Sequence, residues 1–162
     1  MTITELIDNM AEFLKPVVAD YNAQKDSVQS DIKIIAGYPP KLDGNEERPS
    51  AVYVMVNDAI DDTAPNDFSK ATVTLSFDIT DNDKVDGWRN LYNLMEHTRQ
   101  ELLKHRIVAK RNKLLLPIKF KTPFEQPWPH WQGAIIADYT IGQPEEEGFI
   151  YDDFISRQVG PG

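Results

Sequence analysis

The chain has 162 residues, the usual size of one domain, with 26 acidic and 17 basic residues and no cysteine. A chain of this length can bury enough apolar surface to fold without a covalent staple. The lack of cysteine excludes disulfides, thiolate metal sites and a cysteine nucleophile. The net charge of −9 disfavours general binding to nucleic acid, because such a surface repels phosphates.

The start of the sequence lacks the basic residues and continuous apolar run of a signal peptide. No stretch approaches the ~20 apolar residues that cross a bilayer. We therefore expect a protein that is soluble or carried within a larger assembly, and that makes no membrane contact.

The first predicted element is an amphipathic helix over residues 3–21. Thr2 or Thr4 can cap its start. Pro16 lies inside the pattern, and we expect a kink there because the carbonyl that loses its hydrogen bond faces away from the apolar stripe. That stripe follows steps of three and four and comprises Ile3, Leu6, Ile7, Met10, Phe13, Leu14, Val17, Val18 and Tyr21.

Three strands are predicted next. The first is short, at residues 32–35, and the third, at residues 72–80, alternates apolar and polar side chains, which indicates one buried face. The second, at residues 51–57, is apolar on both faces, with Tyr53 and Met55 opposite three valines. Such a strand is central in its sheet or has one face covered by a partner, so Tyr53 and Met55 are candidate interface residues.

A second helix is predicted from about Asp83 to about His105, and two strands follow, at residues 116–120 and 135–141. The order α-β-β-β-α-β-β predicts an α+β fold: a mainly antiparallel mixed sheet of about five strands with two amphipathic helices packed on one face. Residues 1–142 form this single domain. The buried stripe of the second helix is expected to comprise Trp88, Leu91, Tyr92, Met95 and Leu102.

Residues 143–162 form an acidic, aromatic-containing C-terminal arm that begins with three consecutive glutamates after Pro144. A disordered tail is usually poorer in large apolar groups, so the arm is a candidate docking segment. A frayed end, or an arm folded on its own domain, is equally compatible with the sequence. The candidate interface residues of the arm are Phe149, Tyr151 and Phe154.

Few residues suggest catalysis or metal binding. His97, Glu101 and His105 recur at steps of four on the second helix, but a row on a helix face that we expect to be solvated cannot surround one ion. Residues 81–87 depart from the calcium-loop template, and helix capping explains their carboxylates. Paired carboxylates elsewhere fall in predicted loops, where nothing raises a pKa for acid–base work. We expect no catalytic residue, no cofactor and no metal.

The most informative segment is residues 123–133, which holds three prolines and three aromatic residues. Prolines stiffen the backbone, so aromatic side chains on this loop can anchor an interface with little loss of entropy. The candidate residues are Phe124, Trp128 and Trp131. The alternative is that Trp128 and Trp131 pack back over the sheet edge and close the domain's own core.

This segment, followed by the strand-like residues 133–139, resembles the tail-terminator, or tail-completion, proteins of long-tailed bacteriophages. Four further features agree with that family. They are the N-terminal amphipathic helix, the Ala-Gly-Tyr-Pro-Pro sequence at 36–40, the two-faced strand after Pro49-Ser50 and the Trp-Arg-Asn-Leu helix at 88–91. The similarity covers about residues 3–142.

The resemblance implies a structural virion subunit without catalytic residues, encoded by a phage or prophage. It implies a homo-oligomeric ring, expected to be a hexamer, that caps the tail tube and joins it to the head-completion proteins. Its place would be the head–tail junction of the virion, and the host cytoplasm during assembly, with no sequence-specific binding of nucleic acid. The alternatives are a small non-enzymatic adaptor that binds a protein partner through the Trp128/Trp131 loop, and an enzyme with an unrecognised site.

Overall fold

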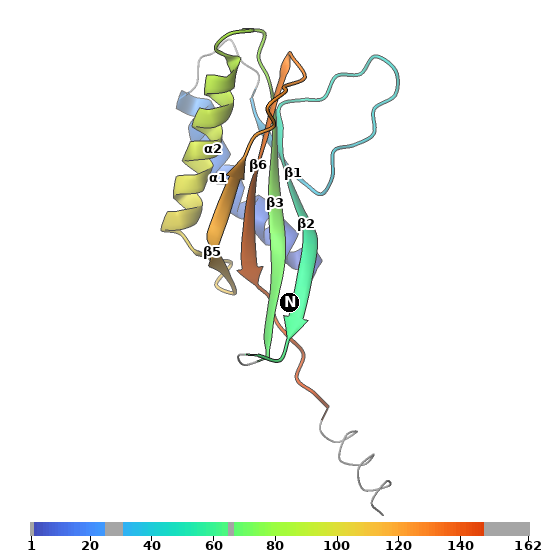
Figure 1. Ribbon diagram of the computed structural model, residues 1–162, viewed down its shortest axis with the longest axis vertical. Coiled ribbons are helices and arrows are strands. Elements are labelled where there is room, and N and C mark those ends of the chain that lie inside the picture. The colour runs from blue at the N-terminus through green and yellow to red at the C-terminus, as the bar shows by residue number, and fades with distance from the viewer. Residues whose placement is uncertain (1, 25–30, 65–66, 148–162) are drawn as a thin grey trace, which may run out of the picture.

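The computed structural model describes residues 2–24, 31–64 and 67–147 (Figure 1). The strands form one six-stranded mixed sheet in the order β1-β2-β3-β6-β5-β4. The pairing of β1 with β2 is parallel, and the other four pairings are antiparallel. The elements in chain order are α1 (Ile3–Gln24), β1 (Lys33–Ala36), β2 (Ala51–Asp62), β3 (Phe68–Thr80), α2 (Gly87–Lys104), β4 (Ile107–Val108), β5 (Asn112–Lys121) and β6 (His130–Thr140).

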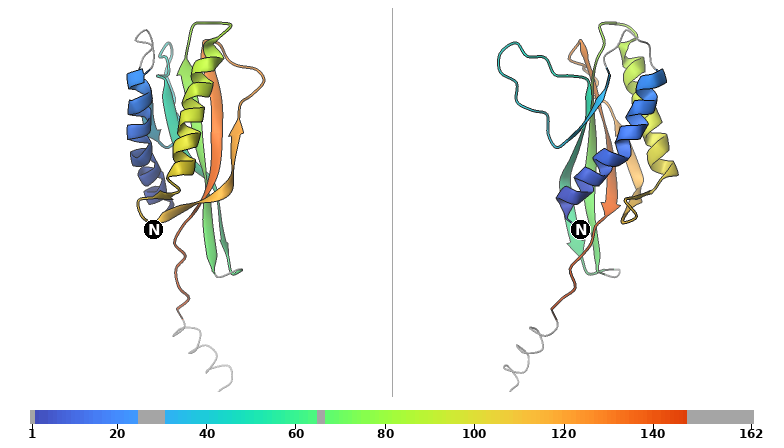
Figure 2. Two further views of the ribbon diagram at one scale, coloured as in Figure 1. Left: turned by 90° about the vertical axis from the view of Figure 1, so that its left-hand side faces the viewer. Right: turned by 180° about the vertical axis from the view of Figure 1, so that it is seen from behind.

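Both helices cover the same face of the sheet (Figure 2). The α+β class, the mixed sheet and the placement of the helices confirm the predicted fold. The structure adds β4, a strand of two residues at the sheet edge, which is too short to leave a periodic signal in the sequence.

The core lies between the two helices and the sheet. Helix α1 begins with a reciprocal cap: the Thr2 hydroxyl accepts a hydrogen bond from the Glu5 amide (3.1 Å), and the Glu5 carboxylate accepts one from the Thr2 amide (2.9 Å). The helix does not end at Pro16 but continues to Gln24. Its apolar stripe packs on α2 and on the helix-facing side chains of the sheet, and the largest fully buried residues of this core include Leu6, Met10, Leu14, Leu75, Phe77, Leu91, Leu94, Met95, Leu102, Ile135 and Tyr139.

The structure corrects the buried stripe of α2. Trp88 and Tyr92, which the pattern placed in the core, are 37% and 38% exposed. At 100° per residue, the centre of the observed stripe lies about 70° away from Trp88, so this residue and Tyr92 fall on one flank. Spacing alone cannot distinguish two neighbouring apolar columns of one helix. The observed stripe is Gly87, Leu91, Leu94, Met95, Thr98 and Leu102.

The sheet face away from the helices is partly buried as well. Tyr53 and Met55 of β2 form a small cluster there with Ala51 and Ile35, and Tyr53 is only 1% exposed. The loop of residues 37–50 projects beyond the β1/β2 edge of the sheet (Figure 1). Tyr53 and Met55 are therefore interior residues of this chain in the state described, and the exposed interface residues must lie elsewhere. None of the described helices combines the length and apolar character needed to cross a membrane.

Candidate protein interface

The proline-rich loop between β5 and β6 is held by hydrogen bonds at both ends. The amide side chain of Gln126 donates to the backbone carbonyl of Gln132 (2.9 Å) and accepts from its backbone amide (2.7 Å). At the other end, the hydroxyls of Tyr92 and Thr122 are hydrogen-bonded, 2.9 Å apart. The Trp128–Pro129 peptide bond is cis. These contacts define the conformation of a loop that would otherwise be free to sample many.

Two indole groups tie this loop to the segment that precedes α2. Trp131 Nε1 donates to the carbonyl of Asp81 (3.0 Å), and Trp128 Nε1 donates to the carbonyl of Asn82 (3.3 Å). The amide of Asp81 in turn donates to the carbonyl of Pro129 (2.9 Å). The loop and the segment before α2 are therefore joined by hydrogen bonds at one end of the molecule (Figure 1).

The three candidate aromatic residues of the loop have different environments. Trp131 is 8% exposed and packs against Gly87, where a Cβ atom would lie 2.5 Å from Trp131 Nε1. It closes the domain's own core. Trp128 is 48% exposed, with the ammonium group of Lys84 4.7 Å from its ring centroid, and Phe124 is fully exposed.

A second group of exposed aromatic residues adjoins the loop. The rings of Trp88 and Tyr92 meet edge-to-face with centroids 5.3 Å apart, and those of Tyr92 and Phe120 do so at 5.5 Å. Because the hydroxyl of Tyr92 bonds Thr122 at the start of the loop, the two groups belong to one end of the molecule. We call the five residues together the aromatic surface: Trp88, Tyr92, Phe120, Phe124 and Trp128.

The sequence pattern identified Phe124 and Trp128 but missed the other three residues of this surface. For two of them, the spacing along the sequence is a usable signal. Trp88 and Tyr92 are four residues apart and therefore adjacent on a helix, but the pattern gave that column to the core. Phe149, Tyr151 and Phe154, the candidates in the C-terminal arm, lie outside the described residues.

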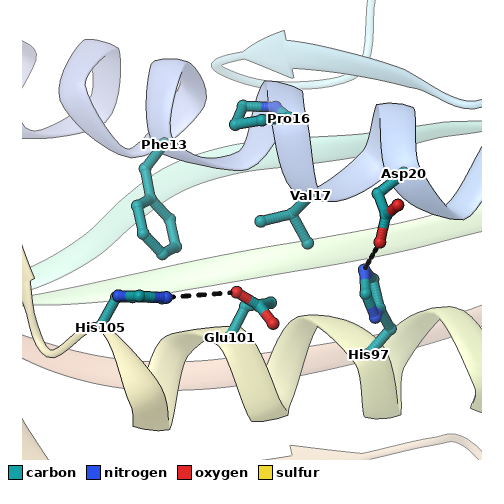
Figure 3. A pocket seen from close by; sticks show the side chains of 7 residues that line it. All are labelled: Phe13, Pro16, Val17, Asp20, His97, Glu101 and His105. Carbon is teal, nitrogen blue, oxygen red and sulfur yellow. Dashed lines mark ion pairs between the residues drawn. The ribbon is translucent and has the colours of Figure 1, made fainter.

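The histidine row of α2 faces α1, which corrects the expectation of a solvated helix face. His97, Glu101 and His105 line a pocket of about 400 Å³ with Phe13, Pro16, Val17 and Asp20 of α1 (Figure 3). His97 Nε2 lies 3.5 Å from the Asp20 carboxylate, and His105 Nε2 lies 3.5 Å from the Glu101 carboxylate. The two imidazoles thus pair with different carboxylates and do not converge on one point. Over the described ranges, no three histidine or acidic side chains are grouped to hold a metal ion.

A buried carboxylate lies on the opposite face of the sheet. Asp78 is 5% exposed and is held by His130 Nδ1 (2.9 Å) and by the side-chain amide of Gln132, which donates to it (3.1 Å). Burial, followed by the charge of Asp78, raises the pKa of the nearby Tyr53, and Arg48 partly opposes this. These hydrogen bonds hold the start of β6, the strand that follows the loop. They therefore help to hold the loop that carries Phe124 and Trp128.

No protein-family model matches this chain, and no curated protein matches it. The function is therefore inferred from the arrangement of its own residues.

Proposed function

We propose that this protein is a structural subunit of a phage or prophage tail, which forms a ring on the end of the tail tube and joins it to the head-completion proteins. The observation that carries the proposal is the aromatic surface at one end of the fold. Five large aromatic side chains are there between 37% and fully exposed. Large exposed aromatic side chains gathered at one end of a folded domain are typical of a protein-binding surface.

The residue types favour an interface with other proteins. Tryptophan, tyrosine and phenylalanine are enriched at the centres of protein interfaces, where they bury much area and have few bonds to immobilise. Arginine is enriched there too, and the guanidinium of Arg89 lies 4.5 Å from the ring centroid of Trp88. The guanidinium lies over one face of the indole, a cation–π contact that places a charge beside the apolar ring.

The rigidity of the surface supports the same proposal. The loop that carries Phe124 and Trp128 is bonded to β6 through Gln126 and to the start of α2 through the two indoles. A loop ordered before docking loses little conformational entropy on docking, so more of the buried area contributes to affinity. A fully exposed phenylalanine on such a loop is well suited to enter a pocket of a neighbouring subunit.

The number of copies in solution separates a ring subunit from an adaptor that binds one partner. We expect light scattering of the concentrated protein to give a mass several times the 18.5 kDa of one chain. The double variant Phe124→Ala/Trp128→Ala should shift this mass towards one copy while the circular dichroism stays unchanged. Ile3→Ala, which truncates an exposed apolar residue of α1, is the matched control and should leave the mass as it is.

Binding to isolated tail tubes tests the remaining part of the proposal. Wild-type protein should bind the tube ends and block further addition of tube subunits, and the double variant should bind more weakly. A protein that has the mass of one copy at every concentration, and that leaves tube ends free, would contradict the proposed function.

A further inference from the structure

The sheet has two edges that lack a neighbouring strand along part of their length, within the residues the structure describes. β1 pairs with β2 at Ala51–Val54, which leaves the outer edge of residues 57–62 without a strand. At the other side, β4 pairs with β5 at Asn112 and Lys113, which leaves the outer edge of residues 116–121 without one. Both open edges contain a register shift, between Val56 and Asp58 on β2 and between Leu115 and Lys119 on β5, and Pro117 has no N–H to donate. Regular backbone that can pair with another chain is therefore confined to residues 58–62 and 119–121.

The two open edges carry opposite charges. The edge of β2 at residues 57–62, which we call the acidic edge, has three aspartates around the 46%-exposed Ile60. The edge of β5 at residues 116–121, which we call the basic edge, has Lys119 and Lys121 beside the exposed side chains of Leu116 and Phe120. Each edge therefore combines a charge with exposed apolar area, and the charges are complementary.

Four of the five charged side chains of the two edges point to the same face of the sheet. Asp58 pairs across the ladder with Thr72, whose hydroxyl donates to Asp138 on β6 (2.6 Å). Lys119 pairs with Ile136, two residues before Asp138 on the same strand. Because side chains alternate along a strand, Asp58, Asp62, Lys119 and Lys121 all lie on the face away from the helices.

We propose that the acidic edge of one copy lies along the basic edge of the next, so that the sheets of neighbouring subunits become continuous. The occupant of each edge is thus a second copy of this chain. Two basic edges or two acidic edges repel each other, which disfavours a symmetric dimer through either edge. A head-to-tail contact between different edges repeats around a rotation axis and can close into a ring, so the inference rests on the proposed ring and adds a strand-to-strand contact to the one expected at the aromatic surface.

Strand direction agrees with this contact. Moving across the sheet, β2, β3, β6 and β5 alternate in direction. When the next copy keeps the same orientation, its β2 runs antiparallel to the β5 that it meets. The alternation then continues from one copy to the next, with the helices of all copies on the same side of the combined sheet.

The offset between copies follows from setting the middle of the acidic edge, Ile60, against Lys119 of the basic edge. Through the ladders, Lys119 lies level with Ile136, Thr74 and Met55, and Ile60 is five residues further along β2. Because β2 has an extra residue between Val56 and Asp58, these five residues advance only four ladder positions, from Thr74 to Lys70 on β3. That offset is about 13 Å along the strands, while the four strands of one copy span about 19 Å across them. The corresponding tilt of the strands is about 35°, at the lower end of the roughly 35–45° of closed β-barrels.

The absence of cysteine in the chain permits a direct test by cross-linking. Ile60→Cys and Leu116→Cys are prepared as separate proteins, mixed at high concentration and treated with a short bifunctional maleimide. The contact predicts a cross-linked dimer in the mixture and little from either protein alone, because neither has a cysteine on both edges. Equal yields from the separate proteins and the mixture, or no product, would overturn the inference.

Charge reversal separates a specific contact from chance collision. Adding Lys119→Glu/Lys121→Glu to the Leu116→Cys protein should lower the yield about tenfold or more, as should adding Asp58→Lys/Asp62→Lys to the Ile60→Cys protein. Mixing the two reversed proteins should restore the yield, which a misfolded variant could not do. Unchanged yields, or failure to restore them, contradict the contact.

The outcome is separable from that of the proposed function. A multi-copy mass in light scattering without this cross-link rejects the edge contact and leaves the ring. A cross-link that responds to charge reversal in a protein that never closes into a ring supports the contact and rejects the ring.

Discussion

Gly87→Ala is expected to destabilise the fold through a single contact with Trp131. Gly87 is the first residue of α2, and a Cβ atom there would lie 2.5, 2.7 and 2.9 Å from three atoms of the indole. The ring has little room to move, because it is 8% exposed and its Nε1 donates to the carbonyl of Asp81 (3.0 Å). The methyl group must therefore displace the indole or the start of the helix.

The magnitude follows from three effects. Inserting a methyl group into a packed site costs about 1–3 kcal/mol. Displacing the indole from the Asp81 carbonyl removes a hydrogen bond worth about 1 kcal/mol. Alanine is favoured over glycine in a helix by at most about 1 kcal/mol, and by less at the first helical position. The clash dominates, and we expect a net loss of about 1–3 kcal/mol in the free energy of unfolding.

A double-mutant cycle with Trp131→Phe measures this contact. Unfolding in urea is followed by far-UV circular dichroism, since tryptophan fluorescence changes with the substitution. In the Trp131→Phe background the atoms nearest to the new methyl group are gone, so Gly87→Ala should be neutral or slightly stabilising. Asn93→Ala, an exposed position on α2, is the control and should change stability by less than about 0.5 kcal/mol. An equal cost of Gly87→Ala in both backgrounds would refute the reasoning.

Three further outcomes are expected. Tyr139→Phe should raise the free energy of unfolding by about 1 kcal/mol, because the buried Tyr139 hydroxyl has no hydrogen-bond partner among the described residues; a loss of that size in urea unfolding would contradict this. Partial burial acts to raise the pKa of Asp138, but hydrogen bonds from Thr72 and Lys70 outweigh it and lower that pKa below its ordinary 3.8. The ion pair therefore adds stability above the unfolded-state pKa and loses it as pH falls through the folded-state pKa, so Asp138→Asn should weaken the protein at pH 7 and reduce the stability lost on acidification below about pH 4. If urea unfolding showed that the wild type and Asp138→Asn lose the same free energy of unfolding on acidification, this role of Asp138 would be excluded. Phe124→Ala should leave the melting temperature unchanged, since the side chain is fully exposed, while weakening self-association in sedimentation experiments; a large drop in melting temperature would show an unseen packing role.

The elements of this fold could be predicted where apolar periodicity is strong. The stripe of α1 and the alternation of β3 each follow one period over many residues, so their types were predicted correctly. The order of strands in the sheet could not be predicted, because pairing depends on contacts between residues distant in sequence. Strand β4 has only two residues, too few to show an alternation of buried and exposed side chains.

The environment of the aromatic residues was predictable only in part. Trp131 continues the buried alternation of β6 through Gly133 and Ile135, so extending the strand backwards would have placed it in the core. Trp88 and Tyr92 were assigned to the wrong side of α2, because a helix with two adjacent apolar columns does not reveal which one meets the sheet. The basic and acidic edges depend on strand order, so no local pattern could have indicated them.

The most direct test of the proposed ring is the mass of the protein in solution as its concentration rises. Multi-angle light scattering should show a transition from one copy of 18.5 kDa to a single larger species with a fixed number of copies. The number should be the same at all higher concentrations, because a closed ring cannot grow. A mass of one copy throughout, or one that increases without limit, would contradict a ring-forming subunit.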